Sequence, residues 1–272
     1  MALTGSPRPK IGLALGAGSA RGLAHIGVLQ VLEEHGVPVD VIVGSSAGAL
    51  VGGVYAACRD LGMMERLATR IKWDHLVDFC FPRMGLIAGD RIHEFLRVLT
   101  RGMSFADLPF PFGATAVDIE TGEEVLLTEG EVALAIRASI AVPGIVAPVR
   151  VGGRLLVDGA VLDRVPAGWT RRMGADFVIA VSAGGNVAGV PDRRRREPVT
   201  NVFEVITTAV ELMQLAILRQ RIIEADVVIA PDLSDIGPTR LDRAAEIIER
   251  GRTAARAALA GIQKRLEGAP VC

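Results

Sequence analysis

Ser46 is the residue of this sequence best placed to act as a nucleophile. It lies at the centre of Gly44-Ser45-Ser46-Ala47-Gly48, a G-x-S-x-G pentapeptide. An apolar run precedes this pentapeptide and a helical pattern follows it, which is the context in which the motif forms a sharp turn and exposes the serine hydroxyl. Ser45 fills the turn, and the helix that begins there points its positive end at Ser46. A glycine-rich turn that is packed closely for structural reasons is the competing interpretation.

A serine hydroxyl is a weak nucleophile until a neighbouring base takes its proton, and the histidines are poorly placed for that role. They are His25, His35, His75 and His93, and no histidine follows His93. An α/β-hydrolase has its histidine late in the chain, after the serine and the acid. Structural roles suffice for His25 and His35 on the first predicted helix. We therefore expect the base to be a carboxylate.

Asp158 is the carboxylate that we expect beside Ser46. It ends the apolar run Leu155–Val157 and is followed by Gly159 and Ala160, which allow a turn. A carboxylate with an ordinary pKa near ~3.9 is a poor base toward an alcohol, so the site should exclude water, since desolvation raises the pKa. The structural alternative is an Asx turn.

The glycine-rich loop Gly16–Gly22 is the third element that could do chemistry. It follows a strand-like run and opens a helical pattern, so its backbone N–H groups converge on whatever lies in front of them. Beside a serine turn, the N–H groups of Gly18 and Ser19 would face a tetrahedral oxyanion, and Arg21 would add charge or brace the loop. In a nucleotide-binding protein such a loop cradles phosphates, but the spacing here is not G-x-G-x-x-G and no P-loop Lys-Ser/Thr follows.

Strands that alternate with helices must position these residues. Ile11–Leu15 and Val39–Val43 are predicted strands, and each precedes a helical pattern, one from Leu23 to Leu32 and one that ends at Cys58. This β-α-β-α order predicts an α/β protein with a parallel sheet. Later strand-length runs lie at Phe112–Ile119, Glu124–Leu127, Arg154–Val157, Phe177–Ser182 and Val227–Ala230, and an apolar stripe from Leu241 to Leu266 predicts a final helix.

Length and composition indicate one globular domain. The 272 residues include 30 Lys plus Arg and 31 Asp plus Glu, and this balance disfavours a general nucleic-acid binder. Half of the residues are hydrophobic, which argues against global disorder. Since no linker-like segment divides the chain, we expect a single domain over residues 10–268 after a flexible stretch of residues 1–9.

The cysteines and the apolar segments indicate a cytoplasmic protein. Cys58, Cys80 and Cys272 are odd in number and widely spaced, so they form neither a disulfide framework nor a metal cluster. The first residues lack the apolar core of a secretory signal. Val41–Cys58 carries no charge, but its glycines and serines divide it into a buried strand and a helix, which we favour over a membrane span.

Two segments admit two interpretations each. Residues 73–89 concentrate aromatic and apolar side chains, and they form either a core segment or a mobile lid that dries the site and meets lipid. Gly184–Thr200 is predicted as an exposed loop, and its run Arg193–Arg196 is either solvated or in contact with anionic headgroups.

Taken in order, the Gly16–Gly22 loop, the Gly44–Gly48 turn and the Asp158-Gly159-Ala160 triplet resemble the patatin-like phospholipase family. The sequence is most similar to the bacterial members and to the catalytic domain of neuropathy target esterase. The resemblance covers nearly the whole chain and includes the segment IRASIAVPGIVAPV. It implies a three-layer α/β/α sandwich with a mostly parallel central sheet.

The resemblance also implies a function. It is that of a Ser-Asp dyad hydrolase, of phospholipase or lysophospholipase type, which acts on acyl esters of lipids with no metal or other cofactor, in the cytoplasm and with or without peripheral contact at a membrane. Ser46 is similar to the family's nucleophile and Asp158 to its dyad acid, while Gly18, Ser19 and Arg21 lie in its oxyanion loop. The remaining motif positions are Gly16, Gly22, Gly44, Gly48, Gly159 and Ala160.

Two departures from the family pattern and two alternative functions complete the expectations. Ala17 and Ser19 replace glycines of the common glycine run, and Asp163-Arg164 stands where an Asn-containing sequence is usual. An acyltransferase on the same dyad is the first alternative. The second is a nucleotide-binding regulatory protein, for which Asp40 would be the acid that binds ribose.

Overall fold

The computed structural model describes residues 8–72, 78, 84–184 and 222–268, with isolated positions between 202 and 214. The strands of this part form one eight-stranded sheet in the order β5-β6-β3-β2-β1-β7-β8, and β4 also pairs with β3. The strands are β1 (Ile11–Leu15), β2 (Val41–Ser45), β3 (Phe112–Asp118), β4 (Glu124–Leu127), β5 (Val149–Val151), β6 (Arg154–Asp158), β7 (Phe177–Val181) and β8 (Val227–Ile229). The helices are α1 (Ala24–Glu34), α2 (Ala47–Cys58), α3 (Leu61–Ala68), α4 (Asp90–Leu99), α5 (Val132–Ser139), α6 (Ala167–Arg172) and α8 (Ala244–Gly268).

The sheet is mostly parallel, as the sequence predicted. Strands β1, β2, β3, β7 and β8 pair in parallel, while β4 and β6 run antiparallel to β3, and β5 runs antiparallel to β6. The predicted strand at Val39–Val43 begins two residues later, and the short strand β5 was not predicted. The uncharged segment Val41–Cys58 forms β2 and α2, and none of the described helices has the length and apolar character needed to cross a membrane.

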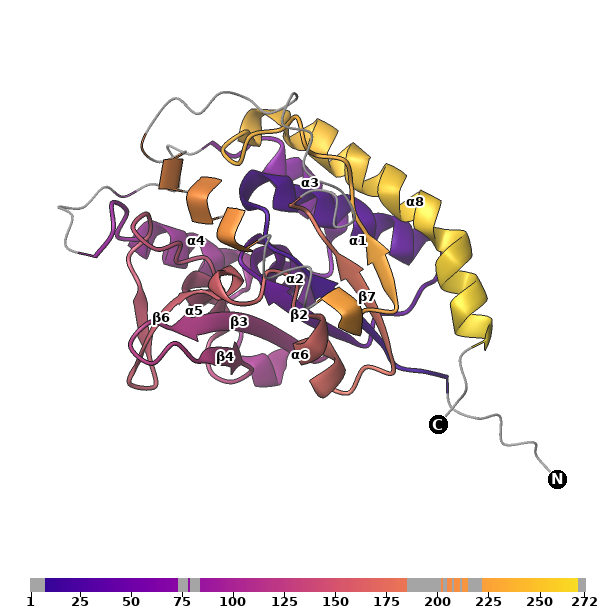
Figure 1. Cartoon of the computed structure of the whole chain (residues 1–272), viewed down its shortest axis with the longest axis horizontal. Coiled ribbons are helices and arrows are strands. Elements are labelled where there is room, and N and C mark those ends of the chain that lie inside the picture. The colour runs from indigo at the N-terminus through magenta and orange to yellow at the C-terminus, as the bar shows by residue number, and fades with distance from the viewer. Residues whose placement is uncertain are drawn as a thin grey trace.

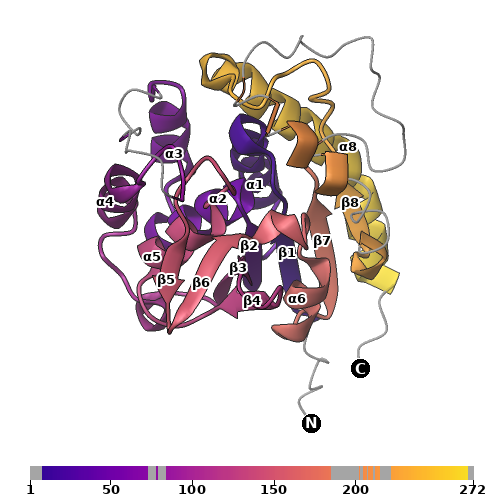
Figure 2. The same cartoon turned by 60° about the vertical axis from the view of Figure 1, so that its left-hand side comes forward.

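Side chains of different size cover the two faces of the sheet. In β1, Ile11, Leu13 and Leu15 pack with α1, α2, α5 and α8, whereas Gly12 and Ala14 face α6. Because successive side chains of a strand point to opposite faces, the large side chains of β1 face one helical layer and its small residues face the other. Figures 1 and 2 show the resulting arrangement, with α1, α2 and α8 on one side of the sheet and α6 on the other.

Helices α1 and α8 lie side by side, and glycines allow their backbones to touch (Figure 1). A Cβ atom on Gly27 of α1 would overlap the carbonyl oxygen of Ile248, and one on Gly251 of α8 would overlap that of Ala24. This close contact continues directly into the glycine-rich loop, which precedes α1. The crossing of α1 and α8 therefore helps to fix the position of the loop.

We predict that Gly27→Ala lowers the free energy of unfolding by about 1–3 kcal/mol, because the added methyl group must separate two packed backbones. Gly261→Ala is the matched control on α8. A Cβ atom there meets nothing within 4 Å, so the same substitution should stabilise the helix by about 0.5–1 kcal/mol. Chemical denaturation of both variants measures the difference, and equal effects at the two sites would contradict the close packing.

Several segments singled out in the sequence lie outside the described residues. They are residues 1–7 of the expected flexible N-terminus, nearly all of Trp73–Arg83, and the loop from residue 185 that contains Arg193–Arg196. At the described end of the expected lid, Ile87 is buried and pairs with Val146. Arg137 holds this end in place, because its guanidinium donates to the carbonyl oxygens of Ala88, Gly89 and Ala147.

Candidate active site

Ser46 lies in a sharp turn between β2 and α2. Its backbone has φ 54° and ψ −120°, a conformation that L-residues rarely adopt. Side chains on Gly44 or Gly48 would collide with the backbone of Ala49 or Leu15, so the turn requires both glycines. The Ser46 N–H donates to Ser139 Oγ at 2.9 Å, a contact that ties the turn to α5. The turn thus holds the Ser46 hydroxyl at the carboxyl end of β2.

Strand register brings Asp158 to the same place. In β3, Thr115 pairs with Ser45 of β2, and the next residue, Ala116, pairs with Asp158 of β6. Ser46 Oγ donates to Asp158 Oδ2 at 2.7 Å, and the backbone N–H of Ala160 donates to Oδ1 at 2.8 Å. Both carboxylate oxygens of Asp158 therefore accept a hydrogen bond.

Burial sets the electrostatics of this pair. Asp158 is 2% exposed and Ser46 is 7% exposed. Desolvation raises the pKa of Asp158 to about 6, although the hydrogen bonds from Ser46 and Ala160 and the charge of Arg164 act in the opposite direction. The carboxylate is therefore a stronger base than an exposed aspartate, and it is still ionised at neutral pH.

Hydrogen bonds hold the glycine-rich loop on both sides of the Gly18 and Ser19 amides. The N–H groups of Gly16 and Ala17 donate to the carbonyl oxygens of Val181 and Arg164, and that of Ala20 donates to Pro238. Within the described residues, the N–H groups of Gly18 and Ser19 have no acceptor, and both residues line a cavity beside Ser46. Ser19 has φ 49°, a backbone conformation that usually favours glycine.

His25 contacts the backbone at the start of the glycine-rich loop. Its ring is fully buried, and Nε2 lies 2.7 Å from the carbonyl oxygen of Gly16. Burial lowers the pKa of His25 to about 4, so the ring is neutral and Nε2–H donates to that carbonyl. Nδ1 of His35 lies 2.9 Å from the carbonyl oxygen of Val31 in the last turn of α1, and Nε2 of His93 lies 3.2 Å from a carboxylate oxygen of Glu131. None of these three rings is hydrogen-bonded to Ser46, and His75 lies outside the described residues.

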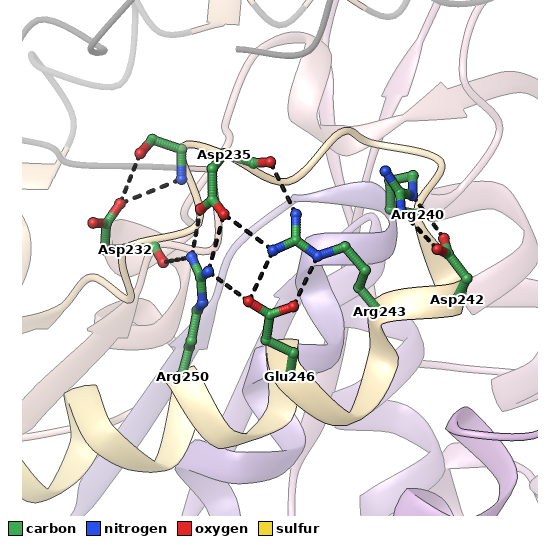
Figure 3. Close-up of polar contacts among 8 residues, drawn as sticks. Asp232, Asp235, Arg240, Asp242, Arg243, Glu246 and Arg250 are labelled. Atoms are coloured by element: carbon green, nitrogen blue, oxygen red, sulfur yellow. Dashed lines mark hydrogen bonds and ion pairs between the residues drawn. The ribbon is translucent and has the colours of Figure 1, made fainter. Parts of the chain in front are cut away.

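Pro238 belongs to a loop that ion pairs attach to α8. Asp235 accepts from Arg243 and from Arg250, at 3.0 and 2.5 Å, and Glu246 bridges the same two arginines (Figure 3). The hydrogen bond from Arg250 is the main cause that holds the pKa of Asp235 well below its usual range, so the network persists across ordinary pH. Because the Pro238 carbonyl accepts from Ala20, the network also anchors the glycine-rich loop.

Two cavities meet at Ser46, and they differ in size and character. The larger has a volume of about 230 Å³ and extends from the Ser46 turn between α2, α3 and α4. Its walls are almost entirely apolar and include Ile26, Leu50, Val51, Val54, Met64, Leu67, Ile71, Ile92, Phe95, Leu96 and Leu99. The smaller, about 40 Å³, includes Gly18, Ser19, Asp158 and two arginines, Arg21 and Arg164. We call them the apolar cavity and the arginine cavity.

The structure thus brings Ser46, Asp158 and the Gly18–Arg21 part of the loop together, and it adds residues that the sequence did not single out. Ser139 supports the turn, and Pro238 lines both cavities. Arg164, noted in the sequence only as part of the unusual Asp163-Arg164 pair, lines the smaller cavity. A signal for Ser139 was present, since it lies in the segment IRASIAVPGIVAPV that resembles the family. Asp40, by contrast, directly precedes β2 and lies beside the start of β1, where it accepts hydrogen bonds from Arg8 and from the Ile11 N–H. This is the opposite end of β1 from the glycine-rich loop. Asp40 is badly placed to bind the ribose of a nucleotide held by the loop.

Residues 13–168 match the sequence profile of the patatin-like phospholipases. The chain belongs to this family. An uncharacterized NTE family protein of Mycobacterium bovis is 41% identical over 198 residues, which are 72% of this chain and 55% of the relative. The lysophospholipase NTE1 of Debaryomyces hansenii is 32% identical over 180 residues, which are 64% of this chain and 12% of that protein.

A solved structure has the same fold. VipD from Legionella pneumophila has a TM-score of 0.68 at 15% identity, and the match covers 94% of this chain and 67% of VipD. The expected three-layer α/β/α architecture is confirmed by this neighbour and by the sheet described above. The chain spans about half the length of the mycobacterial relative and a small part of the yeast one.

The pKa of Asp158 predicts the acid limit of any reaction that uses this carboxylate as a base. Since only the ionised form accepts a proton, kcat/KM for an uncharged ester should fall about tenfold per pH unit below about pH 6. Burial raises this pKa, so the limit lies above that of an exposed aspartate. Initial rates between pH 4.5 and 9 measure it, and a rate that stays constant down to pH 4.5 would show that Asp158 is not the base.

Proposed function

We propose that this protein is a lipid acyl hydrolase in which Ser46 is the nucleophile and Asp158 is the base. One observation carries the proposal: the hydrogen bond of 2.7 Å from Ser46 Oγ to a buried carboxylate, in a turn that presents the hydroxyl at the end of β2. Membership of the patatin-like phospholipase family supports lipid hydrolysis as the reaction class.

The geometry suggests how each group acts. Ser46 Oγ attacks the ester carbonyl carbon while its proton passes to Asp158, and the N–H groups of Gly18 and Ser19 donate to the oxyanion that forms. Breakage of the ester C–O bond then releases the alcohol, which takes the proton from Asp158. Water repeats these steps on the acyl-enzyme and frees the fatty acid and Ser46. Arg21, which is 6% exposed, lies within the loop and adds positive charge near the oxyanion.

The larger, apolar cavity indicates which acyl group the substrate carries, and we call it the acyl cavity from here on. It begins at Ser46 and continues past Leu50 to Val54, eight residues along α2, which corresponds to about 12 Å at about 1.5 Å per residue. Such an apolar tunnel gains free energy from each methylene group that it removes from water. We infer that the substrate carries a medium or long acyl chain, as in phospholipids and lysophospholipids.

Labelling with a fluorophosphonate, followed by peptide mapping, tests the nucleophile. We expect label on Ser46 alone, and we expect Ser46→Ala and Asp158→Asn to lose at least about a hundredfold in kcat, since each removes a group that acts in the transition state. Asp158→Asn should keep or raise the melting temperature at pH 8, because it removes a buried charge.

Ser45→Ala is the matched control for the nucleophile. Ser45 is completely buried, and its hydroxyl donates to the carbonyl oxygen of Asp163 at 2.8 Å, so it is not available for reaction. The variant should retain labelling and most of its activity. Label on Ser45, or hydrolysis that survives Ser46→Ala, would refute the proposed function.

Chain-length preference tests the acyl cavity. Val54→Trp should block its far end, so kcat/KM should fall about tenfold or more for a dodecanoyl ester and change less than about threefold for a butanoyl ester, since pocket contacts of a few methylene groups are worth this much. Val98→Trp is the control, because Val98 is 75% exposed on α4. Thermal melts check that both variants are folded, and Val54→Met offers a milder obstruction. Parallel losses on both esters would show that the chain does not enter this cavity.

A further inference from the structure

Arg164 is a buried cation next to Ser46 and Asp158 that the proposed mechanism does not use. It is 3% exposed, and it lines the arginine cavity together with Arg21, Ser46 and Asp158. The described residues that line this cavity include two guanidinium groups and one carboxylate, all close to the reacting atoms. Arg164 belongs to the Asp163-Arg164 pair, which stands where an Asn-containing sequence is usual in the family.

Contacts with three described residues help to hold Arg164 in this position. Its backbone carbonyl accepts from the N–H of Ala17, and its Nη1 donates to Gln214 Oε1 at 2.5 Å. The guanidinium also packs so closely on Gly184 that a Cβ atom there would overlap Nη2. Keeping a guanidinium at this depth costs desolvation free energy.

The proposed mechanism determines what enters the arginine cavity. The acyl chain occupies the apolar cavity, and Asp158 protonates the departing alcohol, so the alcohol part of the ester must lie on the Asp158 side of Ser46. That side is the arginine cavity. Its small volume suits a compact polar group, and its cations favour a negative one.

We propose that the arginine cavity binds the phosphate of a glycerophospholipid leaving group and that Arg164 determines this preference. The proposal rests on the proposed function, since it assigns the leaving-group side of the same site. Arg164 then distinguishes a phosphate-bearing acyl ester from an uncharged one with the same acyl chain.

Two substrates that share a dodecanoyl chain test the proposal: 1-dodecanoylglycerol 3-phosphate and 1-dodecanoylglycerol. Assays at pH 8.5 keep Asp158 ionised even if loss of the neighbouring cation raises its pKa. We expect Arg164→Gln to lower kcat/KM for the phosphate substrate by about tenfold to a hundredfold, the effect of losing a charge-assisted hydrogen bond. The uncharged substrate should change by less than about threefold. Arg256→Gln, an exposed arginine on α8, is the control and should change neither.

Gly184→Ala supplies a second variant that keeps the charge. The new methyl group must push the guanidinium aside, so the preference for the phosphate substrate should fall in the same direction but by less than in Arg164→Gln. Arg164→Lys should retain part of the preference, because it keeps the charge without the planar fork. Thermal melts identify a variant that has lost its fold, and Arg164→Lys then decides in place of Arg164→Gln.

Inhibition separates a headgroup from a free anion. Glycerol 3-phosphate should inhibit hydrolysis of 4-nitrophenyl butanoate by the wild type and much less by Arg164→Gln, and glycerol should inhibit neither. Stronger inhibition by inorganic phosphate than by glycerol 3-phosphate would assign the cavity to free phosphate and overturn the proposal. Equal losses on both dodecanoyl substrates in Arg164→Gln would also overturn it, because they indicate support of the loop. In either case Ser46-dependent hydrolysis of the butanoate ester would stand, and only its failure refutes the proposed function.

Discussion

The hydrogen bond between Ser46 and Asp158 lies in a buried environment, and this burial sets the base strength of the carboxylate. A carboxylate at the surface would be too weak a base for an alcohol, whereas a fully buried one without partners would take up a proton and stay neutral. Asp158 lies between these limits because desolvation is opposed by two hydrogen bonds and by the charge of Arg164. The pKa of about 6 is the result of this balance.

The register of the strands places Ser46 and Asp158 next to each other. Asp158 ends a strand that is antiparallel to β3, and Ser46 follows a strand that is parallel to it, so both side chains reach the same level of the sheet. The glycine-rich loop follows β1, the next strand, and three separate segments accept hydrogen bonds from its amides. Strands and hydrogen bonds therefore hold each group of the proposed site, which favours preorganisation.

Much of the fold was predictable because its signals are local. The runs at Ile11–Leu15 and Glu124–Leu127 gave the observed strand bounds, and the G-x-S-x-G turn gave the position of Ser46. Pairing between distant segments has no local signal, and β5, a strand of three half-exposed residues, carries little periodicity. The acyl cavity was not predictable for the same reason. It forms between α2, α3 and α4, and its residues look like ordinary core positions in the sequence.

At Arg164 the sequence departs from the family pattern, so its role must be inferred from its surroundings in the structure. Its backbone does what the turn after Asp158 requires, since its carbonyl fixes Ala17 of the glycine-rich loop. Any residue could supply that carbonyl, so the choice of an arginine must be explained by its side chain. The charge of Arg164 lowers the pKa of Asp158, so if Asp158 is the base, as proposed, Arg164 weakens that base toward uncharged esters. Under the same proposal, this charge would favour a negative leaving group, because it would offset the repulsion between that group and the Asp158 carboxylate.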